Sequence, residues 1–336
     1  MENTTEKQNR VLSFVQSSGT PTLGNYLGAF RNWRQMAAEN DCIFGVADLH
    51  ALTVRNAPAD LRRRSIEMYA WLLALGLDPE KNIVFFQSHV PAHAQLAWIL
   101  NCYTAFGEAS RMTQFKDKSK QHADNVNVGL FTYPILMAAD IQLYNPDQVP
   151  VGDDQKQHLE ITRDIAVRFN GLYGDVFKIP EPYIGKKGAR IASLTDPEKK
   201  MSKSDPSVKS FVSLTDSNDQ IAKKIKSAVT DSEALVRYDP ANKPGVANLM
   251  TIYSCCTGRD FDAIEAEFEG KGYGDFKAAV ADAVVAEIDP LRSEYERLVG
   301  DKAYISECAK AGAEKAARLA YRTLNKVMKK VGFYQG

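Results

Sequence analysis

Near its start the chain reads Val11-Leu12-Ser13-Phe14-Val15-Gln16-Ser17-Ser18-Gly19-Thr20-Pro21-Thr22-Leu23-Gly24-Asn25-Tyr26. The apolar run that opens this stretch predicts a short buried strand, and the Ser, Gly, Thr and Pro residues after it predict a turn. A helix is predicted to follow, because apolar residues recur three and four positions apart at Leu27, Phe30, Trp33 and Ala37. A strand, a turn and a helix in this order indicate one unit of an α/β fold.

The turn before that helix is a candidate phosphate site. Backbone N–H groups at the start of a helix lack partners within the helix, and the helix dipole favours an anion there. Gly24 removes a side chain that would keep a ligand from the backbone, and Thr22 and Asn25 offer neutral donors. An ordinary Gly-Ser turn with a helix cap explains the same residues equally well, and the stretch is neither a GxGxxG nor a Walker loop.

Strand and helix signals alternate through the first half of the chain. Residues 42–47 and 83–86 read as buried strands, Pro58 opens a helix that Gly76 closes, and a further helix is expected over about 92–105. This alternation predicts an α/β fold with a doubly wound, Rossmann-like parallel sheet. Ligands of such sheets bind beyond the carboxyl ends of the strands, which places the expected site in the turn after Val15 and the segment after Ala47.

Strand signals fade beyond Met201. Helical patterns over residues 219–229, 276–298 and 302–331 predict a smaller, all-helical domain there. We therefore expect four parts: a polar N-terminal lead at 1–10, a Rossmann-like domain at 11–199, a helical domain at 200–300, and a C-terminal helix at 301–336 that packs back on the first domain.

The composition is that of a globular protein, with 336 residues, 44% apolar and 25% charged. Because 42 basic residues balance 42 acidic ones, a general DNA-binding protein is disfavoured, and any RNA contact must use local patches. The sequence has no apolar run of about 18 residues, no secretory signal, and five cysteines without a CxxC spacing. We expect a cytoplasmic protein with reduced thiols, without a membrane span and without a metal site of its own.

The most specific short stretch reads Lys199-Lys200-Met201-Ser202-Lys203-Ser204. Lysines around small hydroxyl residues suit a triphosphate, because their charge can follow the negative charge that develops on a departing pyrophosphate. A solvated lysine-rich linker would explain a generic KKxxK pattern. The full string Lys-Met-Ser-Lys-Ser is much rarer and favours the phosphate site.

That string, Lys200 to Ser204, matches the second signature of class I aminoacyl-tRNA synthetases. Thr22-Leu23-Gly24-Asn25 resembles the first signature as it stands in the tryptophan-specific branch, where Thr and Asn replace the usual histidines. Two further stretches resemble the same branch: Met137-Ala138-Ala139-Asp140 and Val151-Gly152-Asp153-Asp154-Gln155-Lys156-Gln157-His158. The four motifs occur in order, and the resemblance to bacterial members of this branch runs from about Val11 to the C-terminus.

The resemblance implies a tryptophan–tRNA ligase, which activates L-tryptophan with ATP, releases pyrophosphate and transfers the amino acid to the 3′ end of tRNA(Trp). Asp140 would accept the indole N–H, and a donor-only indole nitrogen does need an acceptor. An ordinary carboxylate on a helix surface is the alternative, which the apolar neighbours of Asp140 disfavour. The other implied tryptophan-binding residues are Met137 in the indole pocket, Tyr133 and Gln155 at the α-ammonium, and His50 beside the substrate.

The same resemblance implies a nucleotide site. Mg²⁺ would enter with ATP and bridge its phosphates, without a dedicated protein site. Asp154 could form a helix capping box with Gln157 as well as or instead of contacting the nucleotide. The residues implied to act in catalysis are Gln16, Lys118, Lys200 and Lys203. Those implied to bind ATP are Gln16, Ser17, Ser18, Thr22, Gly24, Asn25, Gly152, Asp153, Asp154, Ile191, Lys200, Met201, Ser202, Lys203 and Ser204.

The implied macromolecular partners are tRNA(Trp) and a second copy of the chain, since members of this family are homodimers. The helical domain would read the anticodon. Its candidate phosphate contacts, each of which a solvated helix face explains equally well, are Lys223, Lys224, Lys226 and Arg237.

Three alternatives remain: a tyrosine-specific synthetase, a non-catalytic paralogue, and another adenylyl-transferring enzyme on the same fold. The stretch from Met137 to Asp140 suits a donor-only indole better than a phenol, which both donates and accepts. A paralogue without activity would tend to lose the phosphate-binding lysines, which are present here. Ser17 stands where the family usually has proline, and this change is expected to loosen the turn slightly.

Overall fold

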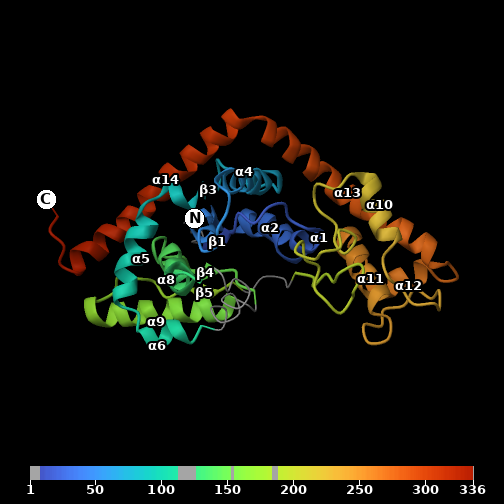
Figure 1. Cartoon of the computed structure of the whole chain (residues 1–336), viewed down its shortest axis with the longest axis horizontal. Helices are drawn as coiled ribbons and strands as arrows, with labels where there is room; N and C mark the ends of the chain where they lie inside the picture. The colour runs from blue at the N-terminus through green and yellow to red at the C-terminus, as the bar shows by residue number, and fades with distance from the viewer. Residues whose placement is uncertain (1–7, 113–125, 153–154, 184–187, 336) are drawn as a thin grey trace, which may run out of the picture. The chain divides into compact units, whose positions relative to one another are not determined.

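The computed structural model describes residues 8–112, 126–152, 155–183 and 188–335 (Figure 1). By its internal contacts the chain divides into two compact units. Unit 1 comprises Met1–Gly19, Met36–Gly185 and Asp301–Gly336, and unit 2 comprises Thr20–Gln35 and Lys186–Gly300.

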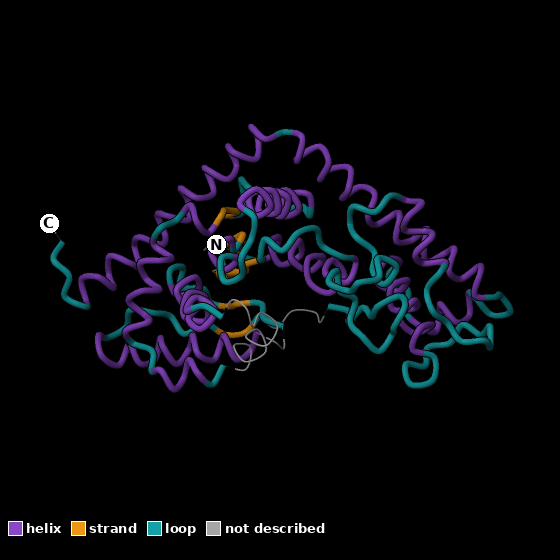
Figure 2. The backbone as a smooth tube through the Cα atoms, viewed as in Figure 1, coloured by secondary structure: helices purple, strands orange, loops and turns teal. Residues whose placement is uncertain are grey.

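A five-stranded sheet lies within unit 1, drawn in orange in Figure 2. The chain adds strands on one side of β1 and then returns to place β4 on its other side. All neighbouring strands are parallel. The direction of growth reverses between β1 and β4, which is where sheets of this kind bind ligands. In spatial order the strands are β3 (Ile83–Phe86), β2 (Asp41–Val46), β1 (Arg10–Val15), β4 (Gln148–Val149) and β5 (Glu181–Pro182).

Helices follow the strands along the chain, and the predicted doubly wound α/β fold is confirmed. Leu12, Ile43 and Phe85 on the strands share one buried core with side chains of several helices. The helices of unit 1 are α3 (Asp48–Ala51), α4 (Pro58–Ala74), the 3-10 turn η2 (Gln87–His89), α5 (Ala92–Cys102), α6 (Phe106–Ser110), α8 (Val128–Gln142), α9 (Lys156–Tyr173) and α14 (Lys302–Lys330).

The edge strand β3 is covered by α14, which also contacts α4 and α5. Gly312 of α14 lies so close to the backbone carbonyl of Val84 that a Cβ at this position would overlap it. The same carbonyl accepts a hydrogen bond from the hydroxyl of Tyr69 at 3.0 Å. An uncovered edge strand presents unpaired backbone groups to other chains, so this helix closes a surface that would otherwise invite association.

Unit 2 is largely helical. Helix α13 packs against both α10 and α11. The elements of this unit are α1 (Leu23–Asn25), the π-helical turn η1 (Tyr26–Phe30), the first part of α2 (Arg31–Glu39), α10 (Asn218–Lys226), α11 (Pro244–Thr257), α12 (Phe261–Glu267) and α13 (Tyr273–Gly300).

The helix predicted after the first turn is present, but it is not regular. Leu27, Phe30 and Trp33 are buried, as their spacing predicts, but the next buried residue is Met36, and Ala37 is only partly buried. The helix begins with the π-helical turn η1 and continues as α2, in which both Met36 and Ala37 lie on the side of Trp33.

Residues 20–35 and 186–199 group with the helical residues, whereas the sequence suggested a division at residue 199. The backbone N–H of Leu23 donates to Val212 at 2.8 Å, and that of Leu214 donates to Pro21 at 3.0 Å. Thr22 and Ser213 form an antiparallel bridge. These bonds join segments far apart in the chain, so no local sequence pattern predicts them.

Most predicted elements agree with the structure to within a few residues at their ends. Strands β4 and β5 were not predicted, because two residues are too few to show an alternating pattern. None of the described helices combines the length and the apolar character that a bilayer crossing requires.

Candidate active site

The carboxylate of Asp140 is the centre of a buried hydrogen-bonded cluster in unit 1. It projects from α8 and is 2% exposed. Its Oδ1 accepts from Gln87 Nε2 at 2.6 Å and lies 2.7 Å from His93 Nδ1. Its Oδ2 lies 2.7 Å from His50 Nε2. A carboxylate this deep in a protein requires such partners, because an unpaired buried charge is strongly unfavourable.

The partners of Asp140 come from the carboxyl ends of the parallel strands. His50 stands on α3, which follows β2, and Gln87 follows β3 directly. His93 is on α5, the next helix along the chain. The rule that ligands bind beyond the carboxyl ends of such strands therefore points at this cluster.

Asp140 is held in its ionised form. Burial opposes the charge, but the hydrogen bonds from His50 and His93 outweigh it and hold the pKa of Asp140 below its ordinary value. The pKa of Tyr144 is shifted in the other direction. Burial and the nearby charge of Asp140 raise it well above its usual range. The cluster thus surrounds a negative carboxylate with hydrogen-bonding side chains.

Tyr133 and Met137 lie on the same face of α8 as Asp140, because the spacings of four and three residues bring them to one side of a helix. The hydroxyl of Tyr133 lies 2.8 Å from Nε2 of the buried His158. The rings of His50 and Tyr133 meet edge to face with centroids 6.2 Å apart. Of the residues implied to bind tryptophan, the structure thus gathers Asp140, His50 and Tyr133 and sets Met137 beside them.

Gln155, also implied to bind tryptophan, stands at the N-cap position of α9 and makes no side-chain cap bond there. Its backbone N–H donates to the carbonyl of Gly152 at 2.9 Å, and Gly152 is exposed. Asp153 and Asp154, between them, lie outside the described residues, as does Lys118.

The turn after β1 holds Gln16, Ser17 and Ser18. Gln16 and Ser18 are exposed, and the N–H of Ser18 donates to the carbonyl of Gln16 at 2.8 Å. Ser17 is 4% exposed, and its Oγ has no hydrogen-bond partner among the described residues. A buried hydroxyl without a partner carries a desolvation cost that proline, which has no polar side-chain atom, would not.

The two signature stretches both lie in unit 2. Thr22 and Asn25 form a reciprocal helix cap, in which the Thr22 hydroxyl accepts from Asn25 N at 3.2 Å and Asn25 Oδ1 accepts from Thr22 N at 3.0 Å. The helix cap that the sequence left open as an explanation is therefore present. Thr22 is buried, whereas Asn25 is exposed.

Gly24 and Met201 bring these two stretches into contact. A Cβ built on Gly24 would lie 3.2 Å from Cβ of Met201, closer than side chains normally approach. Met201 is 3% exposed, and its N–H donates to the carbonyl of Ile191 at 3.0 Å. Three of the residues implied to bind ATP, Gly24, Ile191 and Met201, are thereby packed together.

Around this buried methionine the loop is open. Lys200, Ser202 and Ser204 are exposed, and Lys203 is partly buried. The N–H of Ser204 donates to Ser202 Oγ at 3.2 Å. One apolar side chain anchors the loop, whereas Lys200, Ser202 and Ser204 are exposed around it.

The comparisons with known proteins agree on one family. The model of tRNA synthetases class I (W and Y) matches residues 4–288. The chain is a class I tRNA synthetase of this tryptophan and tyrosine family.

The relatives of this synthetase cover it almost completely. It is 52% identical over 331 residues to a tryptophan–tRNA ligase of Clostridium tetani, with 98% of each chain covered. A tryptophanyl-tRNA synthetase from Mycoplasma pneumoniae superposes with a TM-score of 0.86 at 35% identity, covering 97% of this chain and 98% of that one. The enzyme from Campylobacter jejuni, solved with ADP and tryptophan, gives a TM-score of 0.84 at 33% identity, covering 96% of this chain and all of that one.

Sequence reasoning missed four residues of the synthetase's buried cluster: Gln87, His93, Tyr144 and His158. A signal existed for three of them. Gln87 follows a predicted buried strand, at the edge of the sheet where ligands bind, and His93 interrupts an otherwise apolar helix segment. His158 ends the stretch from Val151 that resembles the tryptophan-specific branch, whereas Tyr144 carried no signal, since a buried tyrosine usually serves packing.

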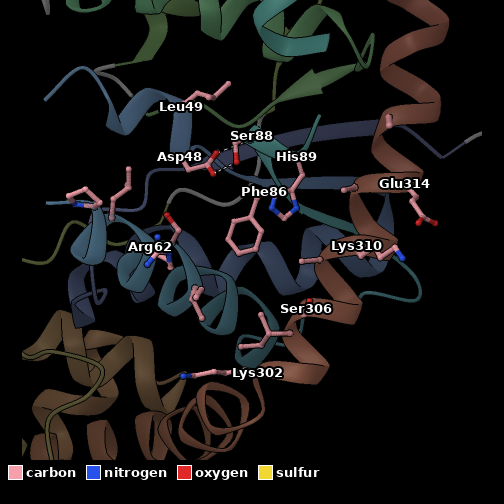
Figure 3. Close-up of a pocket in the computed structure, with 18 of the residues that line it drawn as sticks. Asp48, Leu49, Arg62, Phe86, Ser88, His89, Lys302, Ser306, Lys310 and Glu314 are labelled. Carbon is pink, nitrogen blue, oxygen red and sulfur yellow. Dashed lines mark hydrogen bonds between the residues drawn. The ribbon is translucent and has the colours of Figure 1, made fainter. Parts of the chain in front are cut away.

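Unit 1 of the synthetase also contains a cavity of about 1000 Å³ beside this cluster, between α3, α4 and α14 (Figure 3). Phe86 and His89 lie in its wall, with ring centroids 5.1 Å apart. Asp48 accepts hydrogen bonds from the N–H of Ser88 at 2.9 Å and from its hydroxyl, drawn dashed in Figure 3. The residues that line the cavity do not include Asp140 or its three donors.

Proposed function

We propose that this synthetase is a tryptophan–tRNA ligase, which forms tryptophanyl-adenylate from L-tryptophan and ATP and then transfers the amino acid to tRNA(Trp). The observation that carries the proposal is the buried, ionised carboxylate of Asp140 at the carboxyl ends of the strands. A buried group that only accepts hydrogen bonds suits the donor-only N–H of indole. The 52% identity to a tryptophan–tRNA ligase supports the same choice over tyrosine.

In the first step the carboxylate oxygen of tryptophan attacks the α-phosphorus of ATP. A new O–P bond forms, the bond to the bridging oxygen breaks, and pyrophosphate leaves with that oxygen. The protein contributes placement and charge, and no covalent bond to the enzyme is formed. Mg²⁺ is carried in by ATP as part of the substrate and neutralises phosphate charge.

The nucleotide is assigned to the two signature stretches and the turn after β1. Lys200 and Lys203 would stabilise the charge on the departing pyrophosphate, with Lys118 and Gln16 as further phosphate contacts. The contact between Gly24 and Met201 supports this assignment, because it joins the stretch that starts at Thr22 to the lysine loop.

The amino acid is assigned to the cluster around Asp140. The indole N–H would bind its carboxylate, with Met137 against the ring. Tyr133 and Gln155 would hold the α-ammonium, and His50 would lie beside the substrate. The edge-to-face contact of His50 with Tyr133 supports placing both residues at one ligand.

In the second step the terminal ribose of tRNA attacks the adenylate through its 2′-hydroxyl and releases AMP. We assign anticodon recognition to the helices of unit 2. Of the candidate cations there, Lys223, Lys226 and Arg237 are exposed, whereas Lys224 forms an ion pair with Asp216 at 2.6 Å and is 13% exposed. The exposed three are the better phosphate contacts. The reaction would take place in the cytoplasm.

The proposal includes a homodimer. Trp98 on α5, Phe106 on α6 and Val128 on α8 are 71%, 77% and 77% exposed. The rings of Phe106 and Phe131 lie with centroids 5.2 Å apart, so two of these helices share one apolar surface. Large exposed apolar side chains gathered on packed helices are typical of a protein interface. A second copy of the chain is the expected occupant, and sedimentation of the intact protein measures it.

The deciding experiment is amino-acid-dependent exchange of labelled pyrophosphate into ATP, run in parallel with tryptophan, tyrosine and phenylalanine. Exchange with tryptophan alone is expected. Exchange with tyrosine instead would move the protein to the other branch of its family and remove the role of Asp140. Folded protein that exchanges with none of the three would be a paralogue without this activity.

A further inference from the structure

The two oxygens of the Asp140 carboxylate have unequal surroundings. Each carboxylate oxygen has two favourable positions for a donor. Both positions of Oδ1 are filled, by Gln87 at 2.6 Å and His93 at 2.7 Å. Among the described residues Oδ2 has one donor, His50 at 2.7 Å, and therefore one position left.

The donors on Oδ1 are themselves fixed in orientation. The backbone N–H of Leu49 donates to Gln87 Oε1 at 3.1 Å. Because that N–H can only donate, the amide oxygen must face it, and the amide NH₂ must face Asp140. His93 is fixed in the same sense. Its Nδ1 must carry a proton to bind an ionised carboxylate, and its Nε2 lies 2.8 Å from the Tyr144 hydroxyl, so both ring nitrogens have partners.

The ring of His93 is buried in a group of aromatic side chains. It is 0% exposed and packs against Phe85 and Phe14, which also contact each other with ring centroids 5.7 Å apart. Phe85 stacks on it with centroids 5.8 Å apart and planes 29° apart, and Phe14 meets it edge on at 5.8 Å and 75°. A buried ring packed against its neighbours in this way transmits its own position to the atom that it binds.

We propose that Gln87, His93 and Tyr144 are positioning residues for amino-acid selection. Gln87 and His93 occupy Oδ1 of Asp140, Tyr144 holds the far side of the His93 ring, and Oδ2 is left to accept the ring N–H of the substrate. The inference rests on the proposed function, since it names the atom and the supports of the indole contact. It implies that the site selects aromatic amino acids with a hydrogen-bond donor at the indole nitrogen. A substrate ring without that donor would leave one acceptor position of the buried Oδ2 without a hydrogen bond, and the site would reject it.

The test compares two substrates of nearly the same shape in pyrophosphate exchange. One is tryptophan, and the other is its benzothiophene analogue, in which sulfur replaces the ring N–H. The full-length wild-type chain is expected to prefer tryptophan in kcat/KM on the order of 100-fold. His93→Leu removes both hydrogen bonds of the ring and is expected to lower that preference about tenfold, with the KM for ATP changed less than about twofold.

Two further variants separate positioning from folding. His93→Asn keeps a donor at the place of Nδ1 and is expected to retain the preference to within about threefold. Gln142→Leu is the matched control, because Gln142, on α8, is fully buried like His93 and its side-chain amide makes no hydrogen bond within the described residues. It is expected to leave the preference unchanged.

The proposal is overturned if folded His93→Leu keeps the wild-type preference, or if it loses activity equally with both substrates. Should His93→Leu fail to fold, Tyr144→Phe replaces it, and an unaltered preference in that variant overturns the proposal as well. Wild-type protein that shows no exchange with tryptophan refutes the proposed function itself, and this inference with it. That result is distinguishable, because it is seen without any variant.

Discussion

The cluster around Asp140 and the loop from Lys200 to Ser204 are built in opposite ways. In the cluster, a carboxylate that is 2% exposed is met by donors from three elements, and those donors have further partners. In the loop, Met201 is buried, while Lys200, Ser202 and Ser204 face solvent. The side chains of the cluster are held in place without a ligand, whereas the loop is held by the single buried side chain of Met201.

The difference corresponds to two kinds of task in the proposed reaction. Selecting one aromatic ring over another requires an acceptor whose position is set in advance, because the penalty for a wrong ring depends on leaving that acceptor unpaired. Following a phosphate group as it departs requires charge on side chains that can move with it. Substitutions in the rigid region, the cluster around Asp140, should therefore change which amino acid reacts. Substitutions in the open region, the loop from Lys200 to Ser204, should change the rate of the reaction.

The largest effect is expected from removing the centre of the rigid region. Asp140→Ala removes the acceptor and leaves three buried donors without their partner, so kcat/KM for tryptophan should fall about 100-fold or more. The KM for ATP should change less than about threefold. Pyrophosphate exchange at varied concentrations of each substrate measures both. Equal losses for tryptophan and ATP would show that Asp140 supports the fold rather than the choice of amino acid.

The second effect belongs to the open region. Lys203→Ala should slow adenylate formation by about tenfold to about 100-fold, because a cation at the departing pyrophosphate is lost. Tryptophan binding, measured by fluorescence titration, should stay the same. Lys209→Ala is the control, since Lys209 is an exposed lysine just outside the signature string. An activation rate that is unchanged in Lys203→Ala would remove this lysine from the mechanism.

A smaller effect is expected from a substitution that crowds Met201, the buried side chain of the loop. Gly24→Ala places a Cβ 3.2 Å from Cβ of Met201, so one of the two segments must shift by a few tenths of an ångström. The KM for ATP is expected to rise about threefold, with little change for tryptophan. Gly107→Ala is the matched control, because a Cβ at Gly107 meets nothing within 4 Å. If both variants behave like the wild type, the contact does not set the position of the loop.

The smallest effect is on stability in acid. The pKa of Asp140 is lower in the folded protein than its ordinary value of 3.8, because burial, which would raise it, is outweighed by the hydrogen bonds from His50 and His93. The ionised carboxylate therefore contributes stability that is present above about pH 4 and is lost as the pH falls through the lower folded-state pKa. Asp140→Asn has no such group to protonate. Its melting temperature should approach that of the wild type as the pH drops below 4, and a gap that stays constant would contradict this.

The sequence predicted the framework of both regions but not their internal connections. The strand and turn from Val11 to Gly19 follow from local patterns, and Asp140 was found through its resemblance to the tryptophan-specific branch. The hydrogen bonds from Gln87 and His93 could not be predicted, because they depend on how three separate elements meet. Likewise, nothing near Leu23 indicates a backbone bond to Val212.

Local irregularity limited the prediction in a different way. The spacing of Leu27, Phe30 and Trp33 is that of a helix, but it gives no sign that the first part of this helix, Tyr26–Phe30, is a π-helical turn. A periodic pattern assumes a constant rise and turn, and one wider turn breaks that assumption. Such turns arise from packing and leave no mark in the residue types.

The close approach of Gly312 to Val84 has a consequence for how the protein is made. The strand β3 is synthesised early, but the helix that covers its edge emerges from the ribosome only after all of unit 2. Throughout that interval the nascent chain carries an open strand edge, the feature by which growing polypeptides join one another. Protection of this edge during translation, by a chaperone or by slow release of the nascent chain, would then matter more for the yield of folded enzyme than the stability of the finished molecule.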